Sequence, residues 1–114
     1  MRILVCGGRT FDDDQKLSKV LNLYRTDNMV IIQGEAKGAD TLAKFWAKRN
    51  NVPFESYPAD WNKYGKRAGY IRNNQMLNEG KPDLVIAFPG GVGTQMMIHL
   101  SKAAGISVVE VDAT

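Results

Sequence analysis

The sequence predicts an α/β protein with a Rossmann-like three-layer fold, in which helices cover both faces of a five-stranded parallel sheet. Two observations predict this class. Short apolar runs typical of buried parallel strands alternate with segments that repeat apolar residues at spacings of three and four, as amphipathic helices do. Strands that alternate with helices imply right-handed crossovers and a parallel sheet. With 114 residues, we expect a single domain spanning residues 1–114.

Five apolar runs are the expected strands. Four of them carry Val, Ile or Leu at consecutive positions, as strands buried on both faces do. These four runs are 2–6, 29–33, 83–87 and 107–111. The run at 53–57, PFESY, is more polar and alternates, so we expect it at an edge of the sheet. For strands numbered along the chain, the common order is 3-2-1-4-5, which places the first and fourth strands side by side.

Helical patterns lie between these runs. The segments 13–25 and 38–49 carry the clearest apolar stripes, and 66–79 carries a weaker one. A fourth stripe spans 94–104, where Gly105 is well placed to end the helix. The expected order is therefore a strict alternation of five strands with four helices.

Composition excludes several classes of protein. No apolar run approaches the roughly 20 residues that a membrane span needs, and the N-terminus shows no signal-peptide pattern, so we expect a cytoplasmic protein without membrane contact. One cysteine and one histidine do not make a zinc site, so no metal and no cofactor are expected. Cys6 ends an apolar run and is expected in the core. The net charge of +3 is mild, and its excess gathers at Lys63, Lys66, Arg67 and Arg72.

Three glycine-rich turns follow the strands that are expected to be neighbours. They read GGRTFDD after 2–6, GEAKGAD after 29–33 and PGGVGT after 83–87. Ligands of open parallel sheets bind beyond the carboxyl ends of the strands, where the winding of the chain reverses. Glycine lets an anion approach the backbone, and the helix that follows directs free N–H groups to the same place. The turns therefore predict a phosphate site. PGGVGT is not a nucleoside-triphosphate loop, because no Gly-Lys-Ser/Thr follows its glycines, and it is not a dinucleotide fingerprint, because GxGxxG has a different spacing.

Several side chains are candidates to complete a nucleotide pocket, and each has a structural alternative. Arg9 is expected either to pair with phosphate or to be a surface cation. Asp40 is expected either to accept hydrogen bonds from ribose hydroxyls or to be an acid that the helix dipole favours in the first helical turn. Thr94 is expected either to contact phosphate or to cap its helix. Trp61 and Tyr64 are expected to stack on a base, to cover the rim or to pack in the core.

Four motifs in this order, VCGGRTF, GEAKGAD, PADWNKYGKRAGYIRN and KPDLVIAFPGGVGT, resemble the SLOG superfamily. More narrowly they resemble its small single-domain branch related to the YspA and YpsA proteins (DUF2493), over nearly the whole chain. The resemblance implies a Rossmann-like fold that binds nucleotides or nucleotide-derived ligands, with PGG-x-GT and the first glycine turn on phosphate and sugar. The residues expected to bind the ligand are Gly7, Gly8, Arg9, Gly34, Lys37, Gly38, Asp40, Arg72, Asn73, Pro89, Gly90, Gly91, Gly93 and Thr94.

The resemblance leaves enzymatic activity open. In the related LOG-type phosphoribohydrolases, which cleave the base from a nucleoside monophosphate, glutamate follows PGG-x-GT, whereas this chain has Gln95, Met96 and Met97. A thioether does not stabilise the positive charge that builds on the sugar during cleavage. Sensing or sequestering a nucleotide-derived ligand is therefore the leading hypothesis. Hydrolysis of the base–sugar bond, with Asp40 and Arg72 as catalytic candidates, is the alternative.

The same sequence features lead to expectations about binding partners. Nucleic-acid binding through the basic cluster is disfavoured, because the charge is modest and no known binding motif is present. Superfamily relatives are commonly dimers, and we expect a homodimer or higher homo-oligomer with Met96, Met97 and Leu100 at an interface or in the core. A small chain of this kind is expected from a bacterium or a phage.

Overall fold

A computed structural model describes residues 1–113 and confirms the predicted fold class. Five parallel strands form one sheet in the order β3-β2-β1-β4-β5, so the predicted order is also confirmed. The strands are β1 Arg2–Cys6, β2 Val30–Gln33, β3 Phe54–Ser56, β4 Leu84–Ala87 and β5 Ser107–Glu110. The helices are α1 Asp14–Tyr24, α2 Ala39–Arg49, α3 Trp61–Tyr64, the 3-10 turn η1 Gly65–Arg67, α4 Ala68–Gly80 and α5 Val92–Ala103.

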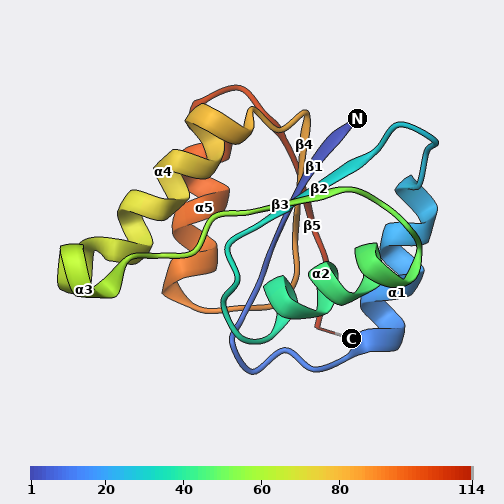
Figure 1. The fold of residues 1–114 in the computed structure, drawn as a ribbon, viewed down its shortest axis with the longest axis horizontal. Coiled ribbons are helices and arrows are strands. Elements are labelled where there is room, and N and C mark those ends of the chain that lie inside the picture. The colour runs from blue at the N-terminus through green and yellow to red at the C-terminus, as the bar shows by residue number, and fades with distance from the viewer. Residues whose placement is uncertain (114) are drawn as a thin grey trace.

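The sheet divides the molecule into two layers of helices (Figure 1), with α1 and α2 on one face and α4 and α5 on the other. Alternate strand residues face the two sides, because successive side chains of a strand point to opposite faces. Ile3 and Val5 of β1 pack with Leu17 and Trp46 on the first side. Leu4 and Cys6 pack on the second side, where the buried helix residues are Met76, Met97 and Ile98. Cys6 is a core residue, as expected.

The strand β1 lies at the centre of the sheet, where the winding of the chain reverses. Ile3 is in register with Ile31 of β2 on one side and with Leu84 of β4 on the other. The carboxyl ends of β1, β2 and β4 are therefore neighbours, and all lie at the lower edge of the sheet in Figure 1. The three glycine-rich turns meet at this edge, as the sequence predicts.

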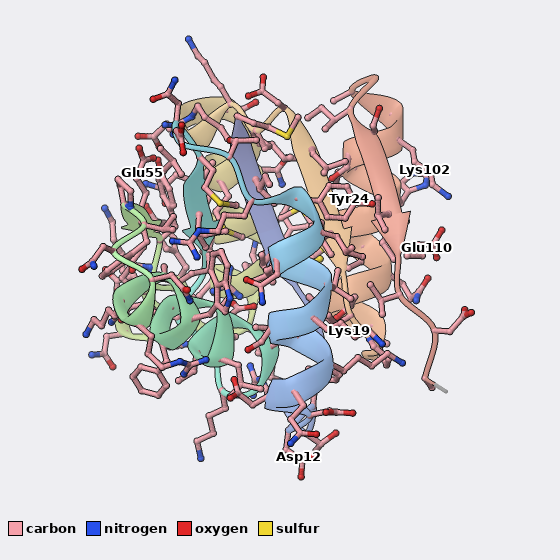
Figure 2. All side chains as sticks on the ribbon, turned by 90° about the vertical axis from the view of Figure 1, so that its right-hand side faces the viewer. Asp12, Lys19, Tyr24, Glu55, Lys102 and Glu110 are labelled. Atoms are coloured by element: carbon pink, nitrogen blue, oxygen red, sulfur yellow. The ribbon has the colours of Figure 1, made fainter. Side chains whose placement is uncertain are left out.

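Two expectations about the elements were wrong. The run 107–111 was expected to be buried on both faces, but the residues of β5, which is an edge strand as the predicted order requires, are half-buried or exposed. Figure 2 shows Glu55 on β3 and Glu110 on β5 at opposite sides of the sheet, where Glu110 pairs with Lys102 at 3.1 Å. The short helix α3 was not expected, because its four residues carry no apolar stripe.

Local capping interactions explain where several helices begin and end. The Asp13 carboxylate accepts the Lys16 N–H at 3.0 Å and starts α1, and Asp60 accepts the Lys63 N–H at 3.0 Å and starts α3. Gly105 follows α5 with a φ of 77°, the left-handed conformation that the sequence indicates for the end of this helix. Of the helices in residues 1–113, none has the length and apolar character needed to cross a membrane.

Candidate functional site

A cavity of about 500 Å³ lies beyond the carboxyl ends of β1, β2 and β4. Its walls are the turn after β1, part of the turn after β2, the start of α5 and residues of α3, η1 and α4. We call it the main cavity. Nine of the fourteen residues expected to bind a ligand line it: Gly7, Gly8, Arg9, Asp40, Arg72, Asn73, Gly91, Gly93 and Thr94.

The glycines of the three turns allow the turns to touch one another. The Gly8 N–H donates to the Pro89 carbonyl at 2.9 Å, which joins the turns after β1 and β4. A Cβ on Gly7 would lie 2.6 Å from the Cβ of Ala39, and one on Gly38 would overlap the Gly8 carbonyl oxygen. Gly7 and Gly38 therefore serve close packing between turns, and this packing builds the base of the site.

The N-terminus of α5 presents backbone donors to the main cavity. Its first helical hydrogen bond runs from the Gln95 N–H to the Gly91 carbonyl at 3.0 Å, so the N–H groups of residues 92–94 have no acceptor within the helix. No side chain caps this end. The helix begins two residues earlier than expected, so Thr94 is a buried residue of the first turn and not its cap. A Cβ on Gly91 or Gly93 would meet no atom within 4 Å, so this edge of the cavity is open.

Asp40 lies at the wall of the main cavity and organises the turn after β2. Its carboxylate accepts the N–H groups of Gly34 at 3.1 Å and Ala36 at 3.3 Å. The residue is only 6% exposed. Burial raises the pKa of this carboxyl to about 6, although the positive charge of Arg72 and the two N–H donors oppose the rise.

Arg72 reaches from α4 across to the same turn. Its Nη1 donates to the Gly34 carbonyl at 2.6 Å, and its Nε donates to the Asn73 side-chain oxygen at 3.0 Å. Burial lowers the pKa of the Arg72 guanidinium, Asp40 raises it, and the nearby positive charge of Arg9 lowers it further. Arg72 therefore joins α4 to the turn after β2 across the site and still has N–H groups free to bind an anion.

The raised pKa of Asp40 predicts how stability depends on pH. The pKa of Asp40 is about 6 in the folded state and lies above the ordinary 3.8, so the folded state favours the protonated carboxyl. The stability that this provides is therefore lost as pH rises from about 4 through 6. This difference corresponds to about 3 kcal/mol. Asp40→Asn keeps an oxygen acceptor for both N–H groups but does not ionise. Urea denaturation from pH 4 to 7 should show the wild type losing about 2 kcal/mol relative to this variant; parallel pH profiles would contradict the assignment.

Aromatic and basic side chains form the rim of the cavity. Trp61 and Tyr64 are 49% and 40% exposed, so neither packs in the core. The Trp61 ring lies against Gly69 of α4, and the Arg9 guanidinium carbon is 5.7 Å from the ring centroid. Lys66 also lines the main cavity. Trp61, Lys66 and Arg72 thus line the main cavity together with the glycine turns, whereas Tyr64 is not among its lining residues.

The remaining five predicted residues lie outside the main cavity. Gly34 and Lys37 line a hollow of about 650 Å³ beside it, and Pro89 and Gly90 line a third hollow of about 580 Å³. Gly38 lines none of the three hollows described within residues 1–113 and caps α2 with a φ of 85°.

Other lining residues were missed as site residues because they carry apolar patterns. Met76, Met96 and Met97 line the main cavity, although Met76 and Met97 also belong to the core. The feature of the sequence that could have identified these methionines as site residues is their position next to the IRN and PGGVGT motifs. Cys6 lines the cavity too, but burial raises the pKa of its thiol to about 12, so it stays protonated. Within the described part of the chain, no group of three His, Cys, Asp or Glu side chains is arranged to hold a metal ion.

Comparison with known proteins bears on this site. A family model described as the YspA, cpYpsA-related SLOG family matches residues 1–64, which include the first two glycine turns and Asp40. The Gene 61 protein of Mycobacterium phage D29 is 36% identical over 118 residues, covering 95% of this chain and 94% of that protein. Its source fits the phage origin considered from the sequence. No solved structure matches the chain significantly.

Proposed function

Because the chain belongs to the YspA, cpYpsA-related SLOG family, we propose that it binds a nucleotide or a nucleotide-derived phosphoribosyl compound in the main cavity, as a sensor or a sequestering protein. The observation that carries this proposal is the uncapped N-terminus of α5, whose amides border an open cavity at the point where the winding of the sheet reverses.

The charges around the cavity support an anionic ligand. Three cationic side chains line it: Arg9, Lys66 and Arg72. The single carboxylate in its lining is Asp40, which is buried and already accepts two backbone N–H groups. Phosphate is the anion that arginine and a helix N-terminus bind best together.

The apolar part of the cavity supports a base as well as a phosphate. Met76, Met96 and Met97 line one wall, with Tyr70 and Val92 at the rim. A volume of about 500 Å³ lies within the range of small-molecule sites. Methionine side chains adapt to flat aromatic groups, and the exposed Trp61 ring offers a surface for stacking. These features fit a ligand with an apolar ring at one end and a phosphate at the other.

Hydrolysis of the base–sugar bond is the second candidate, and the buried Asp40 favours it. A carboxyl with a pKa of about 6 in a cavity wall has the character of an acid–base catalyst. However, both N–H contacts of Asp40 hold it to the turn after β2, and the residues after PGGVGT that line the cavity are Met96 and Met97. With no other carboxylate in the lining, binding without turnover is the better supported function.

Calorimetric titration tests the proposal. Nucleoside monophosphates, cyclic nucleotides and ADP-ribose form the panel, and at least one member should bind with a Kd below about 1 mM. No binding across the panel would contradict the proposed function. The titrated samples are then incubated and separated by chromatography, which should recover the ligand intact. Release of free base or ribose 5-phosphate that is lost in Asp40→Asn would instead establish the hydrolase.

A further inference from the structure

The two oxygens of the Asp40 carboxylate have different surroundings. Oδ2 accepts both N–H groups of the turn after β2, from Gly34 at 3.1 Å and from Ala36 at 3.3 Å. Among residues 1–113, Oδ1 takes part in no hydrogen bond or ion pair, and no buried side-chain oxygen there lacks a hydrogen-bond partner. Oδ1 is therefore accessible, and the main cavity is the one hollow described within residues 1–113 that Asp40 lines.

A proton on Oδ1 would leave the turn after β2 in place. Oδ2 is then a carbonyl oxygen, which still has two lone pairs for the two backbone N–H groups. The ionised carboxylate can only accept hydrogen bonds, whereas the protonated carboxyl also donates one. Asp40 can thus change its charge and its hydrogen-bonding role towards the cavity while the backbone of the turn keeps its contacts.

The charged groups that share the main cavity with Asp40 are cations. Arg72 of α4 donates to the Gly34 carbonyl at 2.6 Å, and Asp40 accepts the N–H of the same residue, yet no ion pair joins the two side chains. Arg9, in the turn after β1, and Lys66, in η1, line the same cavity. Asp40 is therefore the single source of negative charge in this lining.

The other ionisable groups around Asp40 leave this charge balance unchanged. Burial raises the pKa of the Cys6 thiol of β1 to about 12, so this thiol stays neutral. Glu35, in the same turn, pairs with Lys44 of α2 at 3.1 Å, and neither side chain lines the main cavity. Lys37 lines the neighbouring hollow instead. The protonation state of Asp40 therefore decides whether the lining carries a negative charge.

An anion in the main cavity disfavours the ionised form of Asp40. The residue is 6% exposed, and burial already raises the pKa of its carboxyl to about 6, although Arg72 and the two N–H donors oppose the rise. A negative charge bound beside a buried carboxylate raises that pKa further, because like charges repel more strongly away from water. Uptake of a proton removes this repulsion.

We propose that Asp40 is protonated in the ligand-bound protein, so that binding of the anionic ligand takes up one proton from solvent and Oδ1–H donates a hydrogen bond to an oxygen of the bound anion. This inference rests on the proposed function and adds a dependence on pH to it. The role differs from that expected from the sequence, in which Asp40 accepts from ribose hydroxyls. The protein binds its ligand more tightly in mildly acidic surroundings and releases it as pH rises.

Calorimetry with ADP-ribose and cyclic AMP tests this inference. Their phosphates are diesters and do not titrate near neutral pH, whereas a phosphate monoester has a pKa of about 6. The Kd of the wild type should be at least about tenfold lower at pH 5.5 than at pH 7.5, because the apparent affinity follows the protonated fraction of Asp40. Titrations at pH 7 in HEPES and in Tris, which differ in heat of ionisation, should show uptake of about one proton for each molecule bound.

Asp40→Asn gives the most specific result. Its side chain keeps an oxygen for the two N–H groups and has an amide donor in place of Oδ1–H, so it mimics the protonated carboxyl. At pH 7.5 this variant should bind at least about tenfold more tightly than the wild type, with a Kd that does not change with pH. Asp60→Asn is the matched control. It removes one negative charge at the N-cap of α3, outside the lining, and should keep the pH dependence of the wild type.

The outcomes separate this inference from the proposed function. A Kd that is equal at both pH values without proton uptake, or an Asp40→Asn variant that binds more weakly than the wild type, would overturn the inference and leave nucleotide binding in place. No binding by any member of the panel would overturn both. If a monophosphate is the member that binds, it serves as the probe, and Asp40→Asn corrects for titration of its phosphate. Circular dichroism confirms that each variant is folded.

Discussion

Gly91→Asp is expected to weaken nucleotide binding by at least about 100-fold, which corresponds to about 2.7 kcal/mol, while the protein stays folded. Gly91 is the N-cap of α5, its φ is −101°, and a Cβ at this position meets no atom within 4 Å. Aspartate is a favourable N-cap, so its carboxylate is expected to accept the amides of the first turn. The variant would thus occupy the proposed phosphate donors and place a negative charge beside them.

Two substitutions at the same position separate these effects. Gly91→Ala leaves the amides open and adds no charge, so it should change the Kd only slightly. Gly91→Asn caps the helix without a charge and should fall between alanine and aspartate. Calorimetry gives the Kd of each variant, and thermal unfolding checks the fold. If the folded aspartate variant binds as tightly as the wild type, the start of α5 does not hold the phosphate.

Gly38→Ala is expected to cost about 2–6 kcal/mol of the free energy of unfolding, the largest effect on stability among the changes considered. Gly38 has φ 85° and ψ −129°, a conformation in which a side chain costs about 1–3 kcal/mol. Its Cβ would also overlap the Gly8 carbonyl oxygen and lie 2.9 Å from the Cα of Arg9. Relieving that overlap moves the turn after β1 and adds about 1–3 kcal/mol.

Gly65→Ala is the matched control for this variant. Gly65 has φ 58° and ψ −134°, close to the values of Gly38, but a Cβ there meets no atom within 4 Å. It therefore carries the backbone cost alone, about 1–3 kcal/mol. Urea denaturation of both variants measures the difference, which is the cost of separating the turns after β1 and β2. Equal losses in the two variants would mean that these turns do not pack as described.

The order of the sheet could be predicted because its signals are local and long enough to read. The consecutive Val, Ile and Leu residues of β1, β2 and β4 indicate buried parallel strands, and glycine-rich turns follow these same three strands. Residues 107–111 have a similar composition, but β5 has only one neighbour in the sheet. Composition alone does not distinguish a central strand from an edge strand, because the difference lies in what packs against it.

The candidate site, too, could be predicted only in part from the sequence. Glycine turns can be read from sequence, but the individual role of each glycine depends on what approaches it. Gly38 and Gly91 look alike in the chain, yet one contacts Gly8 and the other borders open space. The contact of Arg72 with Gly34 joins residues 38 positions apart, and the placement of Arg9, Trp61 and Arg72 in the wall of the main cavity depends on the docking of α3 and α4. Such long-range placements require the folded structure.

Amide NMR measures the central claim most directly, namely that the backbone N–H groups at the start of α5 bind the phosphate of the ligand. Isotope-labelled protein is titrated with the member of the panel that binds most tightly, and the chemical shift of each amide is followed. The amides of Val92, Gly93 and Thr94 should show the largest changes, with smaller ones at Gly8 and Arg9. Changes confined to the exposed segment 60–67, or no change at residues 92–94 under saturation, would contradict the account.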